Sequence, residues 1–370
     1  MIGSILEVGG LKKEQARRVL QFLTVVLILF VGLRFHTGSD WDVYIRVFDN
    51  SLLEDDNPYH MEYGYIVLNK ILKFLFDNYY VLQFTVTAFV GFMLYRFVSS
   101  FSHYPITTIT IFVCFFFFHL MSIQRQLIAL GIVVFSTRYI FERKLLVFLC
   151  AISIASLFHI SAIGAILLYF IHKNYGRIFP LILIFLSHIL YFYPGSLKYI
   201  IEFFVPYLPD RLSTISMLHL SNVVYGNGVN YSTGLTHITH IIIGLSYFFF
   251  RKNADPKTIF FANAIVVLLI IRGLSTAISI LLRFELYYLI YAIIAYTYLT
   301  DFFKGDRQIK VFVTSCFLSL FSLIIINGVS SNTRSQITGL PYKYRYRPYY
   351  NVLSHPPEAV QRRDWVEWKN

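Results

Sequence analysis

Long apolar stretches separated by short polar loops run through most of the chain. Each stretch holds about 13 to 20 predominantly apolar residues, and about 20 are needed to cross a bilayer as a helix. The pattern predicts an all-α, polytopic integral membrane protein with roughly ten or eleven transmembrane or half-spanning helices. The predicted helices cover residues 19–35, 79–98, 105–121, 122–141, 145–158, 160–172, 178–193, 234–250, 258–277, 281–299 and 309–326.

Composition supports the membrane class. Hydrophobic residues make up 56% of the chain and charged residues 14%, with a mean hydropathy of +0.60. The net charge of +12 does not indicate a nucleic-acid partner, because most basic residues lie in short loops between apolar stretches, where they set orientation and contact anionic lipid. The three cysteines lie inside apolar runs without a metal-binding or disulfide spacing.

The basic clusters fall on alternate loops, and all of them lie on one side of the membrane if every predicted helix crosses it. Cytoplasmic loops of membrane proteins carry an excess of Lys and Arg, so this side is predicted to be the cytoplasm, with the N-terminus on it. The basic clusters are Lys12 to Arg18, Arg96, Arg138 with Arg143 and Lys144, Lys173 with Arg177, Arg251 with Lys252 and Lys257, and Lys304 with Arg307 and Lys310.

The opposite side is predicted to hold the long polar segments. We expect one transmembrane domain over residues 1–326, with external segments at 34–78 and 194–233, and a C-terminal tail over 327–370 on the same side. Within the first segment, residues 63–76 are apolar but too short to span the bilayer. They therefore predict an amphipathic helix lying in the membrane interface.

Two neighbouring apolar stretches are too short to cross. Residues 145–158 and 160–172 correspond to helices of about 20 Å each, against a hydrocarbon core of about 30 Å, and basic residues flank both ends of the pair. A re-entrant helical hairpin with its apex near His159 satisfies both observations. Irregular backbone at membrane depth persists only where it is buried in protein or lines a cavity.

Permanently charged arginines on the external side indicate an anion site. Arg125 lies between two lipid-soluble stretches, where a charge costs roughly 2.5 to 3.5 kcal/mol, and Arg34, Arg272 and Arg283 fall on the same side. Guanidinium groups suit phosphate oxygens, so a lipid-linked diphosphate accounts for these residues. The alternatives are that Arg125 reaches the headgroups from a helix end and that Arg283 pairs with Glu285.

His159 is the candidate proton acceptor, because an imidazole titrates near neutral pH and can take a proton from a hydroxyl group. The alternative is a buried histidine that only hydrogen-bonds between helices. Asp40 is a second candidate base, and Trp41 and Tyr44 can stack on or bind a sugar. His237 and His240 share a helix face, but no third ligand accompanies them, so no metal is expected.

A series of short motifs recurs along the chain in a fixed order. They are Arg34 with Gly38-Ser39-Asp40-Trp41-Asp42-Val43-Tyr44, Glu62-Tyr63-Gly64-Tyr65, Ile123-Gln124-Arg125-Gln126, Arg143-Lys144, Phe158-His159-Ile160-Ser161-Ala162, Arg283 before Tyr287 and Tyr288, and Pro348-Tyr349-Tyr350-Asn351. In this order the motifs resemble the EpsG family of Wzy-type O-antigen and exopolysaccharide polymerases. Gln124 and Ser39 are extra residues relative to that family's usual Ile-Arg-Gln and Gly-Thr-Asp patterns.

The resemblance implies a metal-independent glycosyltransferase of the bacterial inner membrane, with a GT-C-like polymerase architecture. Such enzymes transfer a glycan from polyprenyl (undecaprenyl) diphosphate to a sugar hydroxyl of the next lipid-linked repeat unit, in O-antigen, lipopolysaccharide or exopolysaccharide biosynthesis. The resemblance also implies that the protein needs no cofactor. The partners that it implies are the bilayer and the lipid-linked oligosaccharide, with a chain-length regulator as a further candidate.

On this resemblance, residue roles follow as hypotheses. His159 or Asp40 deprotonates the acceptor, and the arginines at 34, 125, 272 and 283 bind the diphosphate. Trp41, Tyr44 and Gln126 contact sugar. Two other classes fit a cationic membrane cavity: a flippase for lipid-linked oligosaccharide, and an acyltransferase that modifies surface glycan.

Overall fold

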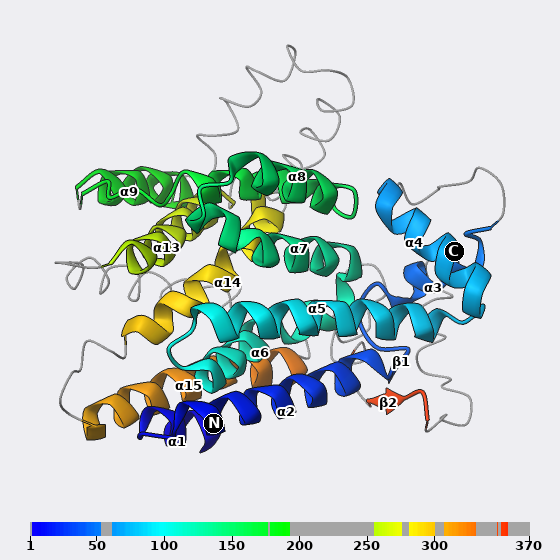
Figure 1. Ribbon diagram of the computed structural model, residues 1–370, viewed down its shortest axis with the longest axis horizontal. Coiled ribbons are helices and arrows are strands. Elements are labelled where there is room, and N and C mark those ends of the chain that lie inside the picture. Colours follow the sequence, from blue (N-terminus) through cyan, green and yellow to red (C-terminus); the bar gives the residue numbers. More distant parts are fainter. Residues whose placement is uncertain are drawn as a thin grey trace, which may run out of the picture. The chain divides into compact units, whose positions relative to one another are not determined.

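The computed structural model describes residues 2–52, 61–176, 178–192, 255–275, 281–299, 307–330, 346 and 349–353. These residues are almost entirely helical (Figure 1). Four helices in this part of the chain are long and apolar enough to cross a membrane, namely α2 (Lys13–Gly32), α5 (Tyr79–Phe101), α6 (Pro105–Ser122) and α13 (Pro256–Ser275). The prediction of an all-α polytopic membrane protein is therefore confirmed.

The chain divides into two compact units. The first contains residues 1–163 and 303–370, and the second contains residues 164–302. Besides α2, α5 and α6, the first unit contains α1 (Ile2–Val8), α3 (Trp41–Asp49), α4 (Tyr63–Phe76), α7 (Gln124–Phe141), α8 (Leu145–Ser156) and α15 (Arg307–Ser330).

Helix α5 is the centre of the first unit. It packs between α2 and α7, and α8 packs against α7 (Figure 1). Leu82, Val86 and Leu94 of α5 are buried in these contacts. At Gly91, a Cβ atom would lie 2.5 Å from Cγ1 of Ile28. Glycine at this position therefore lets α2 approach α5 closely.

The end of α2 is joined to the C-terminal tail. Strand β1 (Arg34–Phe35) pairs antiparallel with β2 (Tyr350–Asn351), and the ring of Tyr349 stacks on Phe30 with centroids 4.5 Å apart. This part of the tail therefore lies at the same end of α2 as the segment 34–78. The side of the membrane that both occupy stays a prediction.

The second unit contains α9 (Ile178–Phe192), α13, α14 (Leu282–Leu299) and most of the 3₁₀ helix η1 (Ile160–Tyr169). Helix α13 packs against both α9 and α14. The side-chain amide of Asn263 donates to the carbonyl oxygens of Ile171 (2.6 Å) and Lys173 (2.8 Å), which fixes the chain after η1.

The helix bounds agree closely with the sequence pattern, with three differences. Helices α1 and α3 were not predicted, and residues 160–169 form a 3₁₀ helix instead of an α-helix. In η1 and just beyond it, every third residue is buried, as a helix with three residues per turn requires. These residues are Ala162, Ala165, Leu168 and Ile171. The predicted span 234–250 lies outside the described residues.

Candidate active site

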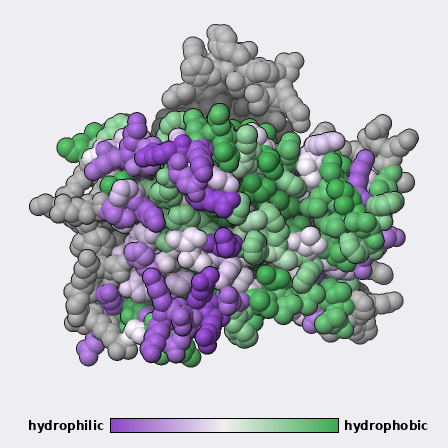
Figure 2. Space-filling view, viewed as in Figure 1, coloured by the Kyte–Doolittle hydropathy of each residue, from purple (hydrophilic) through white to green (hydrophobic). Residues whose placement is uncertain are grey.

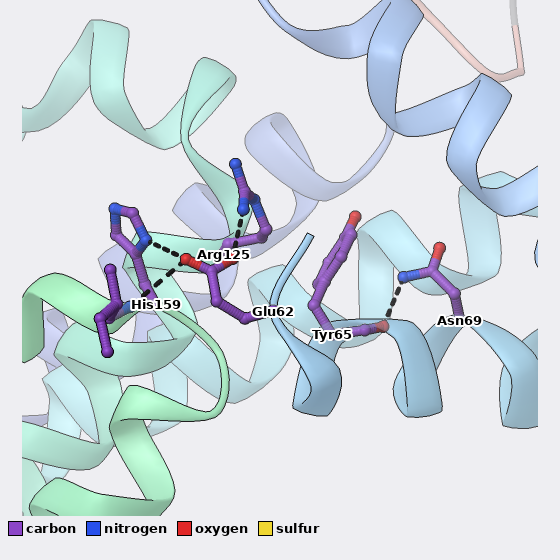
Figure 3. A network of polar contacts seen from close by, with 6 residues as sticks. Glu62, Tyr65, Asn69, Arg125 and His159 are labelled. Carbon is purple, nitrogen blue, oxygen red and sulfur yellow. Dashed lines mark hydrogen bonds and ion pairs between the residues drawn. The ribbon is translucent and has the colours of Figure 1, made fainter. Parts of the chain in front are cut away.

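Three charged or titratable side chains from separate parts of the first unit meet at one point. Glu62 precedes α4, Arg125 lies in the first turn of α7, and His159 follows α8 (Figure 3). Nδ1 of His159 lies 2.7 Å from Oε1 of Glu62, and Nη1 of Arg125 donates to Oε2 of the same carboxylate. The backbone N–H of Ile160 also donates to Oε1, at 3.3 Å. Glu62 thus bridges Arg125 and His159, and we call these three residues the Glu62 cluster.

A close backbone contact brings Glu62 to His159. The backbone N–H of Gly64 donates to the carbonyl oxygen of Leu157 at 2.8 Å. A Cβ atom on residue 64 would lie 2.8 Å from that same oxygen, closer than real side chains approach. Only glycine therefore allows the start of α4 to contact the turn that carries His159.

Arg125 is placed by the junction between α6 and α7. Ile123 ends one helix and begins the next. The side chain of Gln124 accepts from the hydroxyl of Tyr65 (3.1 Å) and donates to the hydroxyl of Tyr79 (2.8 Å). The polar residue that interrupts the apolar sequence therefore links α7 to α4 and α5 through buried hydrogen bonds.

The charge state of Glu62 follows from its neighbours. Burial opposes ionisation, but the hydrogen bond from His159 and the positive charge of Arg125 lower the pKa of Glu62 to about 2. An ionised carboxylate only accepts hydrogen bonds, so Nδ1 of His159 must be the donor. In the neutral imidazole the proton is then on Nδ1, which leaves Nε2 as an acceptor. Among the described residues, nothing bonds to Nε2.

Tyr44 lies beside the cluster. Burial raises the pKa of the Tyr44 hydroxyl to about 12, although the charge of Arg125 and a hydrogen bond with Arg125 act in the opposite direction. The hydroxyl therefore stays protonated at neutral pH. Tyr44 is 4% exposed, and the sugar contact predicted for it stays a prediction.

Arg34 is almost fully buried, with 1% of its surface exposed. Its guanidinium donates to the backbone carbonyl oxygens of Val31 (2.6 Å) and Thr37 (3.2 Å). These bonds hold the turn that follows α2. The diphosphate contact predicted for Arg34 remains untested, but its observed bonds serve the backbone.

The remaining predicted residues of the first unit lie in local contacts. Oδ1 of Asp40 accepts from the hydroxyl of Ser39 at 2.8 Å, and among the described residues no hydrogen bond joins Asp40 to the Glu62 cluster. Trp41 stacks on the ring of His36, with centroids 4.2 Å apart. Gln126 is 6% exposed, one residue after Arg125.

Arg272 and Arg283 belong to the second unit. Nη1 of Arg272 donates to Oε1 of Glu285 at 2.6 Å, and both side chains are largely buried. Glu285 was one alternative partner for Arg283 on the sequence alone, whereas the structure pairs Glu285 with Arg272. Arg283 is exposed at the start of α14. A diphosphate site that these arginines share with Arg125 stays a prediction.

Comparison with known proteins adds one match. The model of the EpsG family matches residues 17–344, which is most of the chain. The chain belongs to the EpsG family. No curated protein and no solved structure matches it, so the GT-C-like architecture stays a prediction. The matched range includes all three residues of the Glu62 cluster.

Glu62 is the site residue of this EpsG-family protein that the sequence analysis did not single out. It appeared only within the motif Glu62-Tyr63-Gly64-Tyr65. Six other acidic residues lie close before it in the sequence, between positions 40 and 56. One signal distinguishes it: it directly precedes the apolar helix 63–76, and a carboxylate is favoured at a helix N-terminus. The signal is weak because several other acidic residues lie in the same segment.

No metal site is evident in the described part of the EpsG-family chain, because these residues contain no group of three or more His, Cys, Asp or Glu side chains placed to hold an ion. His237 and His240 lie outside the described residues.

Proposed function

We propose that this protein polymerises lipid-linked oligosaccharide repeat units at the Glu62 cluster. Membership of the EpsG family supports a role in polysaccharide biosynthesis. The observation that carries the proposal is the hydrogen bond between Glu62 and His159, which orients an imidazole with one nitrogen bound and the other available. This is the arrangement of a general base held by a carboxylate.

In the proposed reaction, Nε2 of His159 takes the proton of an acceptor sugar hydroxyl. The hydroxyl oxygen then attacks the anomeric carbon of the donor glycan, and the bond between that carbon and the diphosphate oxygen breaks. The electron pair of this bond leaves with the polyprenyl diphosphate. The ionised Glu62 stabilises the imidazolium that forms, as a carboxylate does for a catalytic histidine.

Arg125 is proposed to stabilise the leaving diphosphate. Nη1 is paired with Glu62, but a guanidinium has five N–H donors in a fixed fork. Among the described residues, Nε of Arg125 is buried without a hydrogen-bond partner. Phosphate oxygens are strong acceptors for such groups. Arg272 and Arg283 of the second unit are proposed as further diphosphate-binding residues.

Tyr44 and Gln126 are proposed to contact the sugars of the substrate. Tyr44 lies beside Arg125 in space, and Gln126 follows Arg125 in the sequence. Trp41 and Asp40 are proposed as sugar contacts at the start of α3, with Asp40 as the alternative base. A chain-length regulator is proposed as a protein partner, and the inner membrane as the location. His159 is favoured over Asp40 as the base because Glu62 holds it in a defined tautomer.

The test is complementation of a strain that lacks the gene. Wild type restores a ladder of polymer on a gel, whereas Arg125→Ala and His159→Ala leave single repeat units at the cell surface, with equal amounts of protein in the membrane. If both variants retained full-length polymer, the assignment would be wrong. Absence of any surface repeat unit would indicate a flippase, and changed decoration at unchanged length would indicate an acyltransferase.

A further inference from the structure

Helix α4 carries an apolar stripe that points away from the protein. Its exposed side chains are separated by the spacing of one helix face, at 100° per residue. The opposite face, with Tyr65, Asn69 and Leu72, is buried. The apolar side chains of the stripe are Tyr63 (72% exposed), Ile71 (50%), Phe74 (80%) and Leu75 (59%). We call these four residues the α4 stripe.

One end of the α4 stripe lies next to a helix that can cross the membrane. Helix α4 ends at Phe76, and Asp77 turns the chain with φ +44°. The side chain of Asn78 caps α5, which begins at Tyr79 and is long and apolar enough to cross the bilayer. A two-residue turn therefore joins the helix that carries the stripe to a helix that can cross the membrane, and Figure 2 shows a hydrophobic area on the side of the molecule where α4 lies.

The other end of the α4 stripe lies at the Glu62 cluster. Tyr63 directly follows Glu62, whose carboxylate binds Arg125 and His159. Helix α4 has 14 residues, which correspond to about 20 Å at 1.5 Å per residue. Helix α4 therefore covers about this distance between the cationic site and the start of α5.

An exposed face between a charged site and the bilayer fits an amphiphile with an anionic head and a long apolar tail. We propose that the α4 stripe binds the polyprenyl tail of the substrate while Arg125 binds its diphosphate. The inference rests on the proposed function, since it takes a polyprenyl diphosphate as the substrate. It adds that α4 is the route along which the substrate reaches the site from the membrane.

Ordinary lipid-facing helices provide the contrast. Phe92 of α5 is 54% exposed, but it lies in a membrane-crossing helix that does not begin at the Glu62 cluster. Bulk phospholipid is expected to cover Phe92 and to exchange freely there. Selectivity for a polyprenyl chain is expected only along the α4 stripe.

The experiment is site-specific photocrosslinking of the full chain in vesicles. A benzophenone amino acid replaces Ile71 or Leu75, with Phe92 as the matched control position, and radiolabelled undecaprenyl diphosphate is the probe. We expect label at 71 and 75 that is lost with excess unlabelled undecaprenyl diphosphate and retained with excess phosphatidylglycerol. Label at 92 should be weak and insensitive to both competitors.

Two results would overturn the inference: equal label at 71, 75 and 92, or competition by phosphatidylglycerol as strong as by undecaprenyl diphosphate. An Arg125→Ala background should weaken the selective label, because the diphosphate loses its contact. Failure of the proposed function is distinguished by the polymer ladder. If Arg125→Ala and His159→Ala abolish polymer while labelling is unselective, only the tail-binding inference fails.

Discussion

Oε1 of Glu62 lies 2.7 Å from Nδ1 of His159, although 97 residues separate them in the sequence. The contact joins the start of α4 to the turn after α8, and Arg125 of α7 binds the other carboxylate oxygen. Two partners on one carboxylate explain why Glu62 is ionised despite being half-buried. The same contact determines which nitrogen of His159 is available to substrate.

Replacing Glu62 by glutamine should abolish most of the activity. Glutamine is nearly isosteric but neutral, so it neither stabilises an imidazolium nor pairs with Arg125. General base catalysis contributes about 10²- to 10⁴-fold, and a loss in this range is expected for Glu62→Gln. The measurement is the rate of polymer formation by purified protein with lipid-linked repeat units.

The matched control is Glu142→Gln. Glu142 caps α7 at its far end and pairs with Lys144 at 2.7 Å, with 44% of its side chain exposed. Exposed pairs contribute at most about 1 kcal/mol, so this variant should polymerise like wild type. Equal losses in both variants would mean that Glu62 has no special role.

The free energy of unfolding should fall in acid as Glu62 becomes protonated. Its pKa is lowered from its usual value of 4.5 to about 2, so the folded state favours the ionised form. The resulting stabilisation is present above about pH 4.5 and is lost as the pH falls toward 2. It amounts to at most about 3 kcal/mol, because one pKa unit corresponds to about 1.4 kcal/mol.

The measurement is thermal unfolding of wild type and Glu62→Gln in detergent. The gap between their midpoints should narrow as the pH falls from about 4.5 toward 2. A gap that stayed unchanged over this range would show that the pKa of Glu62 is not lowered in the folded protein.

Arg125→Lys should retain protein in the membrane but lose polymer. Lysine keeps a positive charge for Glu62, but its ammonium group is a point charge without the planar fork that binds phosphate bidentately. Membrane protein levels and polymer ladders, measured together, check this. Polymer at wild-type levels would show that a single positive charge is sufficient at this position.

Gly64→Ala should separate Glu62 from His159. The new Cβ atom would lie 2.8 Å from the carbonyl oxygen of Leu157, and backbone cannot move as readily as a side-chain end. Overpacking of this kind costs about 1 to 3 kcal/mol, and we expect loss of polymer with lower thermal stability. Gly3→Ala in α1 is the control, because its nearest neighbour is a methyl group of Ile106 at 3.2 Å.

Most helices could be predicted from the sequence because hydrophobic length is a strong signal in a membrane protein. The bounds of α4 were predicted correctly, since its apolar run is set off by Glu62 and Asp77. Helix α3 was missed because it lies in an acidic segment. Its buried Tyr44 and Phe48 have helical spacing, but a nine-residue helix leaves little pattern to detect.

The candidate site was only partly predictable. Arg125 and His159 stand out because polar groups are costly within apolar sequence, and the structure brings both to one carboxylate. Glu62 could not be selected in this way, because acidic residues are common in its segment and carry no such cost. Pairing across 97 residues depends on tertiary contacts such as that of Gly64 with Leu157.

The central claim is that His159, held by Glu62, activates the acceptor hydroxyl in glycosyl transfer. Its most direct test is polymerisation by purified protein in vesicles that contain lipid-linked repeat units, comparing wild type with His159→Asn at equal protein. Wild type should form products of two and more repeat units, while His159→Asn should leave single units. Formation of the same products at the wild-type rate by His159→Asn would contradict it.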